Sequence, residues 1–126
     1  MLYIEDIGMK PGYYYLTFRD CRKLHTIEKL RFNLATAVSG AFTYCYALQN
    51  ISFEGTIGGS ITFQYSPLSA DTVKSLLDHL DTATYNGTRT ITLKATSKTA
   101  YNDKYGDWNG RIAQLTTSGN WTFSIV

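Results

Sequence analysis

The strongest periodic pattern in the chain places an apolar residue at every third position, and it occurs twice. The segment "FTYCYALQNI" carries it from Phe42 to Ile51, and "FRDCRKLHTI" carries it 24 residues earlier, from Phe18 to Ile27. A spacing of three resembles a helix, but many of the intervening residues are poor helix formers. A period in the twenties instead predicts stacked coils, each with a turn and a strand. The matching pairs are Phe18 and Phe42, Cys21 and Cys45, Leu24 and Leu48, and Ile27 and Ile51.

Within each coil the pattern predicts a turn that leads into a strand. In Leu48-x-x-Ile51-x-Phe53, alternation with a period of two directs Ile51 and Phe53 toward the core. Cys45 suits the far side of the coil because a thiol is small and nearly apolar. Cys21 and Cys45 occupy equivalent places at a spacing compatible with a disulfide, but parallel Cβ directions favour two buried free thiols.

The remaining apolar patterns predict short strands and one clear helix. The helix is expected over 69–81, where an amphipathic stripe follows Ser69, a natural N-cap. It should cover the apolar residues of two strands, at 61–63 and 89–95. Further strands are expected at 2–7, 13–18 and 120–126, with Pro11-Gly12 and Asn86-Gly87 as turns. The polar segment 96–110 is expected to be a loop, and 111–119 a short helix.

Composition limits the classes of function that need to be considered. The 126 residues correspond to one globular domain, with 44% hydrophobic and 17% charged residues. A net charge of +2 with scattered basic residues does not indicate a nucleic-acid-binding stripe. No apolar run approaches the roughly 20 residues that cross a bilayer, so membrane insertion is not expected. The acidic N-terminal segment does not resemble a secretory signal.

The sequence contains no arrangement of residues that is typical of a catalytic site. Its two histidines, His25 and His79, lie far apart and outside any motif. No C-x-x-C, G-x-S-x-G, H-E-x-x-H or phosphate-binding loop occurs. In "NDKYGDWNG" an EF-hand register would put Tyr105 and Thr116 where carboxylates are required, which excludes an EF-hand. A solvated turn is expected there, with a looser calcium site as the alternative. We therefore predict no enzymatic activity, no cofactor and no metal site.

The repeated pattern resembles the BspA-type leucine-rich repeats of bacterial surface proteins, which read roughly A-F-x-x-C-x-x-L-x-x-I. "AFTYCYALQNISF" fits from Ala41 onward, whereas the earlier copy has Lys29 at the position of Phe53. The segments "ITFQYSPLSADTVKSLLDHL", "TRTITLKAT" and "SGNWTFSI" resemble the terminal segment that closes such arrays in gut-bacterial and phage-associated proteins.

The resemblance implies an α/β fold: a short leucine-rich-repeat solenoid with a mainly parallel sheet, one amphipathic helix at about 69–81 and a C-terminal capping segment. It implies a single domain over 1–126. Residues 1–16 would form N-terminal strands or a cap, 17–64 the two repeats, and 65–126 the helix-containing cap.

Repeats of this kind build an extended surface whose variable positions select a ligand. One hypothesis is a non-enzymatic binding module, extracellular, on a cell surface or on a phage tail or virion, that recognises a protein or a host-surface glycan. The other is a structural subunit or tip domain of a phage tail or virion, assembled with copies of itself or with other virion subunits. Aromatic rings stack on sugars and anchor interfaces, which directs attention to the tyrosines. The candidate binding residues are Arg22, His25, Tyr44, Tyr46, Gln49, Asn50, Tyr101, Tyr105 and Trp108.

Overall fold

The computed structural model describes residues 2–9, 18–33 and 40–126. Most of the strand expected at 13–18, together with the Pro11-Gly12 turn, lies outside these ranges. The described residues contain six strands and three helices: β1 (Leu2–Met9), β2 (Leu24–Asn33), β3 (Asn50–Thr56), β4 (Ile61–Phe63), α1 (Ala70–Asp78), β5 (Arg89–Leu93), α2 (Ala95–Tyr105), α3 (Trp108–Gly119) and β6 (Trp121–Ile125).

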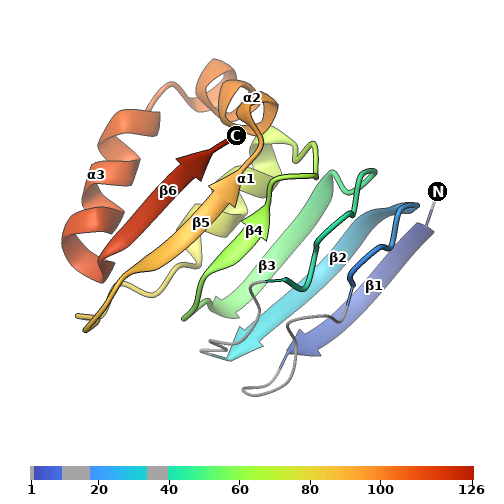
Figure 1. The fold of residues 1–126 in the computed structure, drawn as a ribbon, viewed down its shortest axis with the longest axis horizontal. Coiled ribbons are helices and arrows are strands. Elements are labelled where there is room, and N and C mark those ends of the chain that lie inside the picture. Colours follow the sequence, from blue (N-terminus) through green and yellow to red (C-terminus); the bar gives the residue numbers. More distant parts are fainter. Residues whose placement is uncertain (1, 10–17, 34–39) are drawn as a thin grey trace.

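The strands form two parallel sheets, with the orders β1-β2-β3 and β4-β5-β6. The strands within each sheet are parallel, but β1–β3 point the opposite way to β4–β6, and the helices gather toward the C-terminal part of the molecule (Figure 1). The rings of Phe53 and Phe63 meet edge to face with their centroids 6.2 Å apart, so β3 and β4 lie close together. The predicted α/β class with parallel sheets is therefore confirmed.

The 24-residue offset read from the sequence is the register in which the first two turns stack. Ile27 pairs with Ile51 across β2 and β3, and the rings of Phe18 and Phe42 stack with centroids 5.3 Å apart and an interplanar angle of 11°. A third turn, which the sequence pattern did not predict, continues the column. There Phe63 stacks on Phe42 at 4.9 Å. Three successive aromatic rings therefore hold the turns together.

Small side chains form a second column beside the rings. The thiol of Cys45 donates a hydrogen bond to the carbonyl of Phe18 over 3.0 Å, and the hydroxyl of Ser66 donates to the carbonyl of Cys45 over 2.8 Å. Ser97 extends the series by donating to the carbonyl of Ser66 over 3.3 Å. Cys21 and Cys45 are both free thiols, as predicted, but Cys21 is only half-buried, so the expectation of two buried thiols was wrong for it.

Helix α1 begins after Ser69, whose hydroxyl accepts a hydrogen bond from the Thr72 amide as the capping prediction required. The helix packs beside the free edge of β3. The hydroxyls of Thr72 and Ser75 accept hydrogen bonds from the amides of Ile51 and Phe53 over 3.0 and 2.9 Å. Helix side chains thus complete the hydrogen bonding of a strand that pairs with no further strand on that side within the described residues.

The described residues contain three helices, where the sequence predicted one clear helix at 69–81, a long loop at 96–110 and a short helix at 111–119. The short helix is confirmed by α3. Residues 96–110 are not a loop, because α2 occupies most of this segment and α3 starts at Trp108. The segment misled the prediction since α2 buries only Ser97 and Tyr101, and its Thr, Asn, Asp and Tyr residues have low helix propensity. Gly106, with φ of 71°, ends α2 in the left-handed region that glycine adopts easily.

The second sheet is closed by a buried cation, Arg89, which is 1% exposed. Its guanidinium forms an ion pair with Asp81 over 3.0 Å, donates to the carbonyl of Gly119 over 2.7 Å, and lies 4.5 Å from the centre of the Trp121 ring and 4.1 Å from that of Tyr85. A Cβ on Gly119 would lie 2.4 Å from the Asp81 carbonyl, so this close approach requires glycine. Further carbonyl acceptors for the guanidinium come from Gly58, Asp81 and Ala83.

The last strand, β6, is covered by the segment that precedes it. Trp121 is fully buried, and the ring of Phe123 packs on that of Trp108 with centroids 6.0 Å apart. None of the helices in the described part of the chain combines the length and the hydrophobicity that crossing a bilayer requires.

Candidate binding surface

Three tyrosines from two successive turns form a cluster. Tyr44 and Tyr46 lie in the turn before β3, and Tyr65 lies in the turn after β4. The centroid of the Tyr65 ring is 4.8 Å from that of Tyr44 and 5.7 Å from that of Tyr46. Sequence reasoning missed Tyr65 because it did not recognise the third turn. Its place two residues after Phe63 matches that of Tyr44 after Phe42, and this spacing was the available signal.

Two arginines from the first turn approach the same rings. The guanidinium carbon of Arg22 lies 5.1 Å from the centre of the Tyr46 ring, and that of Arg19 lies 5.6 Å from the centre of the Tyr44 ring. These contacts are within the range of cation–π attraction. Tyr46 is 45% exposed, so the cluster opens to solvent. We call Arg19, Arg22, Tyr44, Tyr46 and Tyr65 the aromatic–arginine patch.

The backbone beneath the patch repeats an unusual conformation. Asp20 and Tyr44, which occupy the same place in successive turns, have φ values of 65° and 63°. The left-handed region costs an ordinary L residue about 1–2 kcal/mol relative to the right-handed one. The amide of Asp20 donates to the carbonyl of Thr43 over 2.7 Å, which ties the two turns together at this point. The tyrosine ring is therefore presented by a turn whose shape is fixed by stacking.

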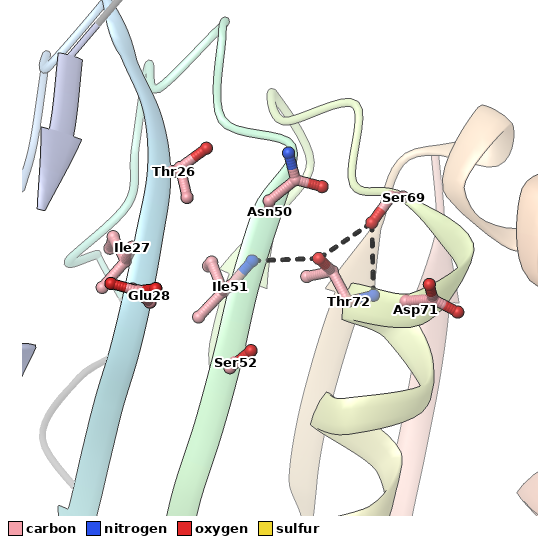
Figure 2. A pocket seen from close by; sticks show the side chains of 9 residues that line it. All are labelled: Thr26, Ile27, Glu28, Asn50, Ile51, Ser52, Ser69, Asp71 and Thr72. Atoms are coloured by element: carbon pink, nitrogen blue, oxygen red, sulfur yellow. Dashed lines mark hydrogen bonds between the residues drawn. The ribbon is translucent and has the colours of Figure 1, made fainter. Parts of the chain in front are cut away.

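A second feature, which we call the polar groove, lies beside the first turn of α1. It has a volume of about 330 Å³. Side chains from β2 and β3 form one side and residues around the start of α1 form the other, as Figure 2 shows. The groove is lined by Thr26, Ile27, Glu28, Asn50, Ile51, Ser52, Ser69, Asp71 and Thr72.

Some polar side chains of the groove already make hydrogen bonds inside the protein, whereas others do not. The hydroxyl of Thr72 donates to the carbonyl of Gln49 and accepts from Ser69 and from the Ile51 amide. By contrast, the side chains of Glu28, Asn50 and Ser52 make no hydrogen bond within the described residues. The wall formed by the strands is therefore the one with free donors and acceptors.

The carboxylate of Asp71 is also engaged, at the rim near α2. It accepts hydrogen bonds from the ammonium of Lys104 over 2.8 Å and from the hydroxyl of Tyr105. These bonds, that from Lys104 first, lower the pKa of Asp71 because they stabilise its charged form. Glu28 is thus the one lining carboxylate with no ion pair among the described residues.

The structure divides the residues that the sequence proposed for binding. Tyr44, Tyr46 and Arg22 come together in the aromatic–arginine patch, whereas Asn50 lines the polar groove. The ring of His25 contacts the hydroxyl of Thr26 at 2.7 Å, which places it at the edge of the groove. Gln49 is exposed, and its backbone accepts from Ser69 and donates to the carbonyl of His25.

The proposed aromatic loop at 101–108 does not form an exposed surface. Tyr101 and Trp108 are only 3% and 6% exposed, and their rings meet with centroids 5.9 Å apart. Burial, together with the hydrogen bond to Asp107, raises the pKa of the Tyr101 hydroxyl. Tyr105 is half-buried and bound to Asp71. The prediction of an exposed loop was wrong because these rings join α2 and α3 to the core.

Comparison with known proteins identifies no match among family models, curated proteins or solved structures. Among the described residues, no group of three or more His, Cys, Asp or Glu side chains is arranged to hold a metal ion.

Proposed function

We propose that the chain is a non-enzymatic binding module, built on BspA-type leucine-rich repeats, that belongs to a cell-surface, phage-tail or virion protein. Its target is the surface of a protein or a glycan. The observation that carries this proposal is the aromatic–arginine patch. In it the ring centroids of Tyr46 and Tyr65, which come from different turns, lie 5.7 Å apart. The repeated residues Phe42 and Cys45 are fully buried, whereas the residues between them reach solvent. Repeat modules use this division to combine a constant core with a variable surface.

The chemistry of the patch favours recognition over structural packing. Tyrosine and arginine are the residue types that carry much of the energy of binding interfaces. Exposed tyrosines present rigid rings with a hydroxyl at the tip, which suits both stacking on sugars and hydrogen bonding. The arginines add donors that can reach carboxylates or hydroxyls on a partner.

A binding panel tests the proposal directly. The purified chain is applied to immobilised glycans and to host extracellular proteins, alongside the variant Tyr44→Asn/Tyr46→Ala. Asparagine tolerates the left-handed backbone at position 44, so the variant is expected to fold. Loss of the panel signal by at least about tenfold, or about 1.4 kcal/mol, supports the proposal. The matched control Asn109→Ala/Gln114→Ala alters two exposed residues of α3 and should keep full binding.

A structural role in a phage tail or virion is the second candidate. It is favoured by the outer strands β1 and β6, each of which pairs with one strand only within the described part of the chain. Such edges invite pairing with another chain. Light scattering separates the two functions. A monomer that binds a panel member supports the module, and a defined multimer that binds none supports the structural subunit.

A further inference from the structure

We propose that the polar groove is a subsite for a neutral sugar ring, adjoining the aromatic–arginine patch. This inference rests on the proposed binding function and assigns the class of ligand. It concerns residues that the sequence did not single out, above all Glu28 and Ser52.

The strand wall of the groove carries four polar side chains, of which Thr26 already bonds to His25. Thr26 and Asn50 are register partners on neighbouring strands, and parallel strands lie about 4.8 Å apart. Glu28 and Ser52 each follow two residues later, are exposed next to the buried Ile27 and Ile51, and both line the groove, although the register of β2 shifts between Ile27 and Leu30. Four polar side chains thus stand in two rows on the open face of β2 and β3 (Figure 2).

This set of groups matches a ring that carries several hydroxyls. Each sugar hydroxyl both donates and accepts a hydrogen bond. The carboxylate of Glu28 only accepts, the amide of Asn50 offers two donors and an acceptor, and the hydroxyl of Ser52 can do either. Neighbouring hydroxyls of a sugar can therefore be bound in pairs. The opposite wall is already saturated, since the Thr72 hydroxyl makes three hydrogen bonds inside the protein.

Charge narrows the ligand class further. The groove is lined by two carboxylates and by no basic residue, which disfavours phosphates and acidic sugars. Asp71 is paired with Lys104, so Glu28 is the one lining carboxylate without a pair within the described residues. One free carboxylate among neutral polar groups suits a neutral ligand. The volume of about 330 Å³ lies at the small end of ligand sites and accommodates one or two sugar rings.

The patch and the groove are close enough for one oligosaccharide to contact both. Tyr46 precedes Asn50 by four residues, which span at most about 14 Å even when fully extended. A ring bound by Glu28 and Asn50 would place the next ring of the chain toward the tyrosines. There the C–H face of a sugar can stack on an aromatic ring.

The test is an NMR titration of the ¹⁵N-labelled chain with three neutral probes: methyl α-mannopyranoside, methyl β-galactopyranoside and N-acetylglucosamine. We expect saturable shifts of the Thr26, Asn50 and Ser52 amides with at least one probe, with a dissociation constant on the order of 1 mM. Asn50→Ala and Glu28→Gln should each weaken this binding about tenfold. The control Ser124→Ala removes an exposed hydroxyl from β6 and should change nothing.

The other outcomes are decisive as well. Absence of saturable shifts with all three sugars overturns the inference, and so do shifts with the methyl esters of lysine or arginine alone, which would indicate a cationic side chain of a protein partner. A panel signal that survives Asn50→Ala but is lost in Tyr44→Asn/Tyr46→Ala overturns the subsite and leaves the binding module standing. A signal that survives both changes overturns the binding role of the patch.

Discussion

The turns from Phe18 to Ser66 and the closing segment from His79 to Ile125 are held together in different ways. In the first, one contact is repeated, as rings stack on rings and each small residue binds the carbonyl of the turn before it. In the second, a single buried guanidinium, that of Arg89, binds the carbonyls of Asp81, Ala83 and Gly119. It also donates to the carbonyl of Gly58 in the first region. Where the same core contact recurs in each turn, the residues between the contact positions can vary. By contrast, every segment that binds the central guanidinium must keep its position.

The same difference separates the surfaces of the two regions. Over the stacked turns the exposed residues include the aromatic–arginine patch and the unengaged side chains of the polar groove. Over the helices, charged residues are used to join elements, as Lys104 pairs with Asp71 and Arg111 with Asp78. The stacked turns are therefore the region suited to recognition, and the helical region is suited to closing the fold.

The largest effect is expected from removing the cation of the closing segment. Arg89→Met leaves the partly buried Asp81 without its partner and strips the Gly119 carbonyl of its donors, which should cost about 3–5 kcal/mol of unfolding free energy. Urea unfolding measures it. The matched control Arg111→Met breaks an exposed pair with Asp78 and should cost less than about 1 kcal/mol. Equal costs would mean that Arg89 is not the centre of this region.

A somewhat smaller effect is expected from interrupting the stacked column. Phe42→Leu removes two ring contacts at once, with Phe18 and Phe63, and should lower the unfolding free energy by about 2–3 kcal/mol. Phe123→Leu, at a half-buried position with one ring contact, is the control and should cost less. The column would not be the organising feature of the first region if the control were the more damaging change.

The buried thiol gives the first region a pH dependence in alkaline solution. Burial raises the pKa of Cys45 from 9.0 to about 11, so the unfolded chain ionises first as pH rises. The stabilisation is complete below the unfolded pKa and is lost as pH rises through the folded pKa, by on the order of 2 kcal/mol. The free energy of unfolding, measured across this pH range, should therefore fall more steeply for the wild type than for Cys45→Ala. Parallel curves would show that the thiol is not held neutral.

The smallest effect concerns the charges that join the helices. Hydrogen bonds from Lys104 and Tyr105 lower the pKa of Asp71, so their stabilisation is present above the unfolded pKa and is lost as pH falls through the folded one. Asp71→Asn should lower the melting temperature slightly at neutral pH and not at all in strong acid. Because the pair is exposed, salt should weaken the difference as well. A salt-independent loss would point to packing instead.

The stacked core could be predicted from the sequence because its contact residues recur at a fixed spacing along the chain. Phe18 and Phe42 or Ile27 and Ile51 recur at a fixed offset, and their register follows directly. Tyr65 was missed because the third turn shortens the pattern to Phe63, Ser66 and Leu68 and leads into a helix instead of a strand. A degenerate copy carries the same structure with only part of the motif.

The closing region and the groove could not be read in this way because their partners are distant. Arg89 meets Asp81 and Gly119 across 8 and 30 residues, and no local pattern marks such a meeting. Trp108 was assigned to the expected loop because α2, whose Tyr101 packs on it, has weak helix propensity and because α3 begins three residues before the expected helix at 111–119. The groove exists only once Thr72 and Ser75 bind the edge of β3, which places the start of α1 beside the strands.

One measurement tests most directly whether recognition belongs to the stacked turns. The ¹⁵N-labelled chain is titrated with the strongest binder from the panel, and the shifted amides are mapped onto the fold. The shifts are expected to concentrate at residues 19–28, 44–52 and 65–72, with little change over 95–119. Shifts centred on α2 and α3, with residues 44–52 unchanged, would contradict this expectation.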